Sequence, residues 1–179
     1  MPPGYKLDPG ETIVRRVNRS VFYLVPVLVS SAIIALAAIG LIYGFNHFGT
    51  LSIVPIPASL ITAVAAVMVG IAGLMLLSAL YVYNRNYLVI TNMHLIKMEQ
   101  NGLFDEQTAQ LDLSRVQDVT GARHGVFGTI FNYGDIEIET AAAQENFVFR
   151  ATTGPQALAD ELLQYHEDYL KANPGREIP

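Results

Sequence analysis

The sequence predicts an α-helical transmembrane hairpin followed by an all-β domain with a helix at its C-terminal end. Two long stretches, residues 21–43 and 58–83, contain no Asp, Glu, Lys or Arg. Beyond residue 84, apolar residues come in short runs rich in strand formers, and an amphipathic segment follows the last run. Six or more short strands followed by one helix predict a small barrel or bent sheet with the helix over its open end.

Residues 1–20 form a polar arm ahead of the first apolar stretch, with four basic and two acidic residues. A signal peptide has an apolar core of about 7–15 residues. The first stretch is longer than this and a second one follows it. We therefore expect a retained membrane anchor rather than a cleaved leader.

Each apolar stretch reaches the roughly 20 residues that a helix needs to cross about 30 Å of hydrocarbon. Both are apolar on all sides, whereas a helix at the edge of a soluble core keeps one polar face. The alternative is a buried helical hairpin in a soluble protein. Small residues recur at Thr62, Ala66 and Gly70, which predicts close packing inside the hairpin or between two copies. The middle of each stretch holds no ionisable residue, which argues against an ion pathway.

The charges around the hairpin predict its orientation. The connection between the two stretches, residues 44–57, contains no Lys or Arg. Basic residues lie on the outer flanks instead, at Arg15, Arg16, Arg19 and Arg85. Since basic residues favour the cytoplasmic side, we expect a multi-pass protein of the plasma (inner) membrane with both termini in the cytoplasm.

The cytoplasmic domain is expected over residues 84–171, with residues 172–179 as a disordered tail. Its predicted strands are 87–90, 93–100, 103–111, 115–120, 135–140 and 146–151. Asn101-Gly102 between two runs is a strong hairpin signal, because both residues tolerate the positive φ of a tight turn. Residues 135–140 alternate between apolar and polar side chains, as a half-buried strand does.

The closing helix is predicted from an apolar stripe formed by Leu158, Leu162, Tyr165 and Tyr169. Thr153 and Gln156 have the spacing of a capping box, and Pro155 suits the first helical turn. Asn-Pro-Gly at residues 173–175 ends the element.

Composition and motifs exclude several classes of function. From residue 84 onward there are seven basic and fourteen acidic residues. Nucleic-acid binding depends on Lys and Arg, so we expect no nucleic-acid partner. The chain has no cysteine, its four histidines lack the spacing of a zinc site, and it has no P-loop or nucleophile elbow. We expect no catalytic residue, no cofactor and no metal.

Four short segments occur in a recognisable order. They are Pro9-Gly10-Glu11, residues 87–91, residues 113–119, and residues 125–134 ahead of 135–138. In this order the chain resembles the bacterial pleckstrin-homology-like (PH-like) membrane proteins, in which two transmembrane helices precede a bacterial PH domain. It departs from them at Met93-His94, where they often carry a basic residue. The resemblance implies a seven-stranded bent antiparallel barrel capped by the C-terminal helix, and it implies no known ligand.

The glycine-rich segment 121–134 has two interpretations. It either folds back to fill the barrel, or it places Phe127 and Phe131 in the membrane interface with Arg123 and His124 near lipid headgroups. Arg115 is a further candidate for this membrane-proximal rim. About four residues separate the second stretch from the first strand, so at about 3.3 Å per residue the domain lies within roughly 13 Å of the bilayer.

We expect a non-enzymatic protein whose partners are the lipid bilayer and either another protein or copies of itself. On this hypothesis the domain is an interaction or self-assembly scaffold. One alternative is a lipid-headgroup sensor that uses Arg115, Arg123 and His124. Another is an accessory subunit of a membrane enzyme or export system.

Overall fold

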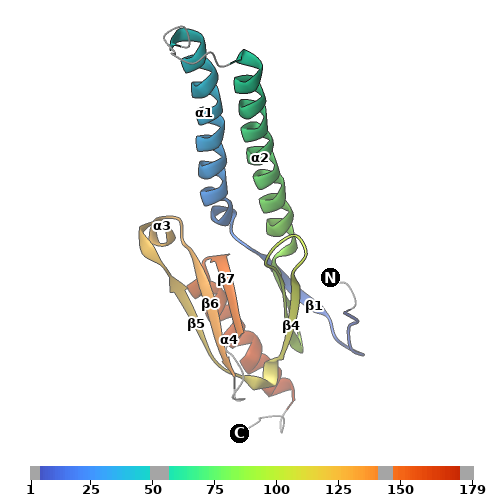
Figure 1. The fold of residues 1–179 in the computed structure, drawn as a ribbon. Helices are drawn as coiled ribbons and strands as arrows, with labels where there is room; N and C mark the ends of the chain where they lie inside the picture. The colour runs from blue at the N-terminus through green and yellow to red at the C-terminus, as the bar shows by residue number, and fades with distance from the viewer. Residues whose placement is uncertain (1–4, 49–56, 141–146, 174–179) are drawn as a thin grey trace. The chain divides into compact units, whose positions relative to one another are not determined.

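The computed structural model describes residues 5–48, 57–140 and 147–173 (Figure 1). The chain divides into two compact units. One contains Met1–Tyr23 with Val82–Pro179, and the other contains Leu24–Tyr81. Most of the expected tail at 172–179 lies outside the described residues, as do the first residue of the strand expected at 146–151 and most of the connection between the apolar stretches.

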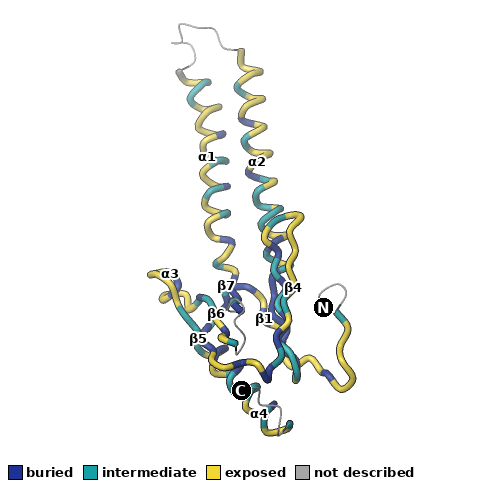
Figure 2. Tube along the Cα trace, turned by 60° about the horizontal axis from the view of Figure 1, so that its bottom comes forward, coloured by how far each residue is buried: buried dark blue, intermediate teal, exposed yellow. Residues whose placement is uncertain are grey.

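The two apolar stretches are long helices. A short 3₁₀ turn, η1 (Val21–Leu24), leads into α1 (Val25–Phe48), and α2 (Ala58–Arg85) follows. In the most apolar window of each helix 11% of the residues are buried, and Figure 2 shows both helices as mostly exposed. The core helix of a soluble protein would be mostly buried, so this exposure disagrees with the alternative of a buried soluble hairpin.

Apart from Leu24, the buried residues among the described part of the helical unit are small. Ser31 and Ala38 are buried on α1, and Ala65 and Ala72 on α2. The row expected to pack, Thr62, Ala66 and Gly70, is exposed. Each residue of a helix is turned by about 100° from the next, so this row lies on a different face from Ala65 and Ala72. The prediction of small-residue packing inside the hairpin is therefore wrong for this row.

The other unit is built from two antiparallel sheets. Sheet A has the order β1 (Ile13–Asn18), β2 (Tyr87–Thr91), β3 (His94–Gln100), β4 (Glu106–Asp112), and sheet B has the order β5 (Val116–Arg123), β6 (Tyr133–Thr140), β7 (Phe147–Thr153). A 3₁₀ turn, η3 (Leu113–Arg115), connects the sheets, a short helix α3 (Gly125–Ile130) connects β5 and β6, and α4 (Pro155–Ala172) closes the unit. The predicted all-β domain with a C-terminal helix is confirmed.

Strand β1 comes from the segment expected to be a separate arm. Asn18 pairs with Tyr87 and Val17 with Leu88, so the domain begins before the apolar helices and resumes after them. The expected boundary at residue 84 therefore omits one strand. The sequence hides it because Arg15 and Arg16 interrupt the alternation and the pairing register shifts between Ile13 and Arg15, as in a β-bulge.

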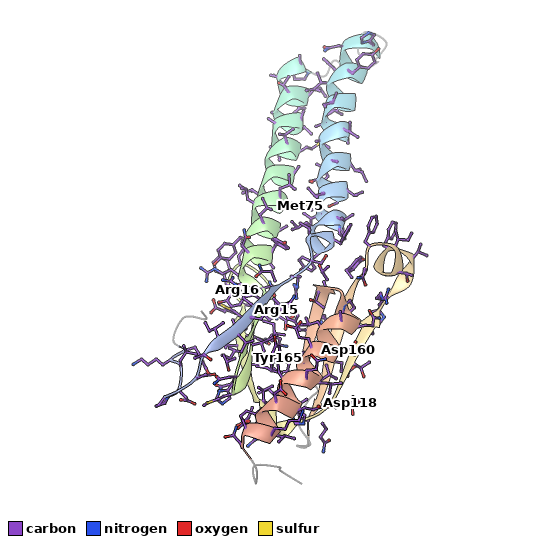
Figure 3. All side chains as sticks on the ribbon, turned by 180° about the vertical axis from the view of Figure 1, so that it is seen from behind. Arg15, Arg16, Met75, Asp118, Asp160 and Tyr165 are labelled. Carbon is purple, nitrogen blue, oxygen red and sulfur yellow. The ribbon has the colours of Figure 1, made fainter. Side chains whose placement is uncertain are left out.

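The core lies between the two sheets and α4. It contains Leu88, Ile90 and Leu95 from sheet A, Val119, Ile136, Ile138 and Phe149 from sheet B, and Leu158 and Leu162 from α4. Arg15 of β1 also forms an ion pair with Glu161 of α4, and Figure 3 shows Arg15 close to Tyr165 of the same helix. The predicted apolar stripe thus packs α4 against both sheets.

Two local predictions differ from the structure. Gly154, not Thr153, is the N-cap of α4, with a φ of 62° and no side-chain hydrogen bond, so there is no capping box. The β3–β4 connection is also longer than a two-residue turn. The Asn101 N–H donates to the Asp105 carbonyl at 3.0 Å, and β4 begins at Glu106 instead of residue 103.

Candidate membrane-facing pole

One end of the β domain carries both chain segments that lead to the apolar helices. We call this end the hairpin pole and define it by residues 20–23 and 82–86. The Arg19 N–H donates to the Asn86 carbonyl at 3.4 Å, next to the Asn18–Tyr87 pair. The buried Asn86 amide donates to the carbonyls of Val82 at 2.6 Å and Gln100 at 3.1 Å. The segment that leaves the β domain toward α1 and the segment that re-enters it from α2 are therefore held side by side.

The helix α3 lies at this pole and presents an apolar surface. Phe22 stacks on Phe131 with ring centroids 4.3 Å apart and on Tyr133 at 5.5 Å. Phe127 and Ile130 are 68% and 66% exposed, so they fill no part of the core. The interpretation that this segment folds back into the barrel is wrong. Its glycines and short length gave no helical period from which the helix could be predicted.

The three polar residues predicted to contact lipid headgroups lie at opposite ends of β5. Arg123 ends β5 and His124 is the N-cap of α3, so both are exposed beside Phe127 and Phe131. The imidazole Nε2 of His124 lies 3.8 Å from the Asp135 carboxylate. Arg115 precedes β5, and an eight-residue strand at about 3.3 Å per residue separates it from Arg123 by roughly 25 Å. The structure brings four of the five residues together and leaves Arg115 at the other end.

The β3–β4 connection is a second apolar feature near the hairpin pole, and the strand expected at 103–111 does not predict it. Leu103 is 50% exposed and Phe104 is 99% exposed. Gln100 is the last residue of β3. Its backbone N–H donates to the Asn86 side-chain oxygen at 3.2 Å, and its Nε2 donates to the Gly102 carbonyl at 2.6 Å. The sequence does contain a signal for this loop, since Leu103 and Phe104 lie between Asn101-Gly102 and Asp105, which are turn-forming residues. The same two apolar residues also fit the start of a strand.

A group of buried and half-buried charged side chains links β3 of sheet A to β7 of sheet B. The Arg19 side chain is 5% exposed and lies 3.4 Å from the Glu99 carboxylate. Its Nε donates to the Arg150 carbonyl, and Lys97 Nζ lies 3.1 Å from Glu99 and donates to the Val148 carbonyl at 2.9 Å. Each of these groups is paired within the fold, so the cluster holds the sheets together.

A carboxylate on the N-terminal segment makes the densest polar contact. Glu11 accepts hydrogen bonds from the Thr91 hydroxyl at 2.6 Å, the Asp8 N–H at 2.9 Å and the Tyr5 hydroxyl, and His94 Nδ1 lies at 2.9 Å. Burial alone raises the pKa of Glu11, but these hydrogen bonds, that of Thr91 first, lower it to about 2. Burial and the neighbouring Glu11 raise the pKa of Tyr5 to about 12.

Asp8, Glu11 and His94 could in principle hold a metal, since their ligand atoms lie within 4.8 Å of one another. Both carboxylate oxygens of Glu11 already accept hydrogen bonds from the protein. These hydrogen bonds attach the N-terminal segment to β2, and we call this contact the Glu11 lock. His94 is the half-buried first residue of β3.

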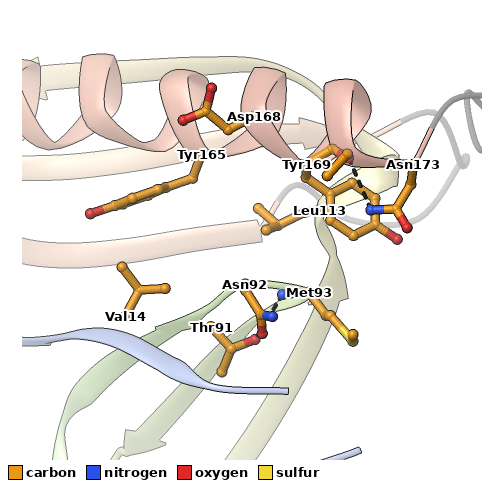
Figure 4. Close-up of a pocket in the computed structure, with 10 residues that line it drawn as sticks. Val14, Thr91, Asn92, Met93, Leu113, Tyr165, Asp168, Tyr169 and Asn173 are labelled. Atoms are coloured by element: carbon orange, nitrogen blue, oxygen red, sulfur yellow. Dashed lines mark hydrogen bonds between the residues drawn. The ribbon is translucent and has the colours of Figure 1, made fainter. Parts of the chain in front are cut away.

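A pocket of about 230 Å³ lies at the end of sheet A opposite the hairpin pole (Figure 4). It is bounded by the β2–β3 turn on one side and the last turns of α4 on the other. Its lining is mostly apolar and includes Val14, Met93, Leu113, Tyr165 and Tyr169, with Asp168 at the side. Its position separates it from the apolar tips described above.

Comparison with known proteins gives two findings. A family model described as "Bacterial PH domain" matches residues 20–166. A crystal structure of a DUF1696 family protein with a pleckstrin-homology domain, from Shewanella loihica PV-4, is similar at 12% identity and a TM-score of 0.36. The similarity covers 49% of this chain and 72% of that one, and at this score it adds nothing to the fold described above. No curated protein matches the chain.

Proposed function

Because the chain belongs to the bacterial PH domain family, we propose that it is an integral membrane protein whose PH-like domain acts as a non-enzymatic scaffold. On this proposal α1 and α2 cross the plasma membrane and hold the domain at the cytoplasmic surface. There it binds copies of itself or another protein.

The pairing of β1 with β2 carries the membrane placement. Val17 and Asn18 precede the hairpin, and Leu88 and Tyr87, their partners, follow it. Paired strands lie on one side of a bilayer, so either both helices cross it or neither does. Their exposed apolar surfaces favour crossing, because an uncovered helix surface of this length is stable in lipid and unfavourable in water.

The charges support a cytoplasmic domain. Residues 44–57 carry no Lys or Arg, whereas Arg85 and three arginines of the N-terminal segment flank the hairpin. The acidic domain would be repelled as a whole by an anionic leaflet, which favours a protein partner over broad adhesion to lipid.

Cysteine labelling tests this topology, since the chain has no cysteine of its own. Asn46→Cys places a thiol near the end of α1, and Asp160→Cys places one on the exposed face of α4. A membrane-impermeant maleimide should label Asn46→Cys in right-side-out vesicles and Asp160→Cys in inside-out vesicles. Labelling of both from the same side, or recovery of the protein in the soluble fraction, would contradict the placement.

Self-assembly is favoured by the exposed row of small residues on α2. Thr62, Ala66 and Gly70 lie four residues apart on a surface that the hairpin does not bury. A Cβ added at Gly70 would have no described atom within 4 Å. In lipid, small residues at this spacing let two helices approach closely. We therefore place the contact between copies at this row.

Substitution of glycine separates this contact from general effects on the helices. Gly70→Leu should lower the dimer fraction several-fold in nanodiscs, measured by mass photometry and cross-linking. Gly40→Leu is the matched control, because Gly40 is equally open on α1 and lies outside the row. If the wild-type protein is monomeric, self-assembly is excluded. If purification from native membranes then yields no partner, the scaffold function fails altogether.

Recognition of lipid headgroups is the second candidate, favoured by Arg123 and His124 beside the exposed aromatic residues of α3. In nanodiscs with anionic lipid, residues 123–131 should exchange amide hydrogens more slowly than in neutral nanodiscs. Arg123→Glu should remove this difference. Arg115→Glu, at the other end of β5, should keep it. Equal exchange in both lipids would exclude the headgroup contact.

A further inference from the structure

We propose that the β3–β4 loop, residues 101–105, is a lipid anchor in which Phe104 inserts into the interface of the membrane that α2 crosses. The inference rests on the proposed membrane placement and adds a second contact to that of α3. The partner of this loop is lipid, and the contact between them is apolar.

The loop is held in a shape that points its apolar residues outward. Its base is closed by the Asn101 N–H on the Asp105 carbonyl and by Gln100 on the Gly102 carbonyl. Between these bonds Phe104 is 99% exposed. A phenylalanine side chain buries about 150–250 Å² when it finds an apolar partner. The fold thus holds a large apolar side chain out of the domain without covering it.

Hydrogen bonds and a charge pair attach both sides of this loop to the end of α2. On one side, Gln100 exchanges two hydrogen bonds with the Asn86 amide. On the other side, Glu106 lies 3.7 Å from Arg85, the last residue of α2. The headgroup layer of a bilayer is roughly 5–8 Å thick on each side of the hydrocarbon. A loop attached at the last residue of a spanning helix therefore lies at the level of this layer.

The second apolar tip, α3, is tied to the first span in the same way. Phe131 stacks on Phe22, which belongs to the apolar segment that begins at Val21. In Figure 1 α3 and the β3–β4 loop lie at the same end of the domain, on different sheets. Two tips on two sheets fix the tilt of a domain against a surface, whereas one tip leaves it free to rock.

The charges of the loop distinguish this contact from headgroup recognition. Residues 101–105 contain no Lys or Arg, and Asp105 follows Phe104. Insertion therefore depends on apolar area and not on attraction to anionic lipid. Anionic lipid should therefore not strengthen this insertion.

Tryptophan fluorescence tests the proposal in the full chain, which has no tryptophan. Phe104→Trp reports on the loop, and Gln110→Trp, exposed on β4, is the control on the same sheet. Leu74→Trp on α2 tests the span itself. Each variant is reconstituted alone in bilayers of neutral or anionic lipid, with acyl chains brominated near the headgroup or near the chain end.

The emission of Phe104→Trp should be quenched by lipid brominated near the headgroup, with less loss from chain-end bromine and with partial protection from iodide. Gln110→Trp should be quenched by iodide and not by lipid. If Leu74→Trp escapes brominated lipid, the membrane placement itself fails. If Leu74→Trp is quenched but Phe104→Trp is not, the anchor alone is excluded. A blue-shifted Phe104→Trp emission without lipid quenching means that protein covers the loop, which also overturns the proposal.

Discussion

The Thr91 hydroxyl donates a 2.6 Å hydrogen bond to the Glu11 carboxylate, although both apolar helices lie between these two residues in the sequence. Asn92 adds two contacts to the same N-terminal segment, to the Thr12 N–H at 2.8 Å and the Gly10 carbonyl at 3.1 Å. The Pro-Gly-Glu segment that resembled a family motif is therefore the lock that holds β1 against β2.

Replacing the carboxylate by an amide should weaken this lock. Glu11→Gln replaces one accepting oxygen by an NH₂ donor, which then faces the donors on Thr91, Tyr5 and Asp8, so at least one of these donors loses its acceptor. We expect the free energy of unfolding to fall by about 1–3 kcal/mol. Asp8→Asn makes the same chemical change at an exposed side chain and should alter it by less than about 0.5 kcal/mol. Thermal unfolding of the detergent-purified chain measures both, and equal effects would contradict the role of Glu11.

The lock should also depend on pH. The pKa of Glu11 is about 2 in the folded protein against an ordinary value of 4.5. The stabilisation is therefore complete above about pH 4.5 and is lost as the pH falls toward 2, by up to about 3 kcal/mol. The stability difference between the wild type and Glu11→Gln should shrink over this range. A difference that stays constant from pH 7 to pH 2 would refute the assignment.

Two arginines of the N-terminal segment, Arg15 in β1 and Arg19 just after it, should differ in their importance for stability. Arg19 is 5% exposed and Arg15 is 50% exposed. Arg19→Ala removes a buried guanidinium that pairs with the half-buried Glu99 and donates to the Arg150 carbonyl, so it should lower the free energy of unfolding by about 3 kcal/mol. Arg15→Ala breaks an exposed pair with Glu161 and should cost less than about 1 kcal/mol. The same unfolding assay compares them, and a larger effect at Arg15 would reverse the ranking.

Gly121 should tolerate no side chain, because α4 lies directly on it. A Cβ at this position would lie 2.4 Å from the Pro155 carbonyl oxygen. Gly121→Ala must therefore displace the start of α4, at a cost of about 3 kcal/mol. Gly102→Ala, where no described atom lies within 4 Å, is the control and should change stability by less than about 1 kcal/mol. Equal melting temperatures would show that α4 shifts freely.

The sequence predicted those elements whose signal is local and periodic. The apolar stripe of α4 and the alternation of Ile136 and Ile138 matched the burial observed in the structure. Strand β1 could not be predicted because its pairing partner lies beyond both helices and its bulge breaks the alternation. Predicting that Arg115 and Arg123 lie far apart would have required knowing that β5 runs between them. Predicting that Phe104 is exposed would have required knowing the length of the β3–β4 loop. Both are tertiary properties.

The insertion of α1 and α2 between two paired strands has a consequence for biosynthesis. The ribosome releases β1 first, then both apolar helices, and then β2, so on the proposed membrane placement sheet A remains incomplete until the hairpin has entered the bilayer. A hairpin with one helix translocated and the other left behind would strand β1 and β2 on opposite faces of the membrane. Such a chain cannot close its domain and stays open to proteases. On the proposed placement, the domain therefore closes only when β1 and β2 lie on the same side of the membrane.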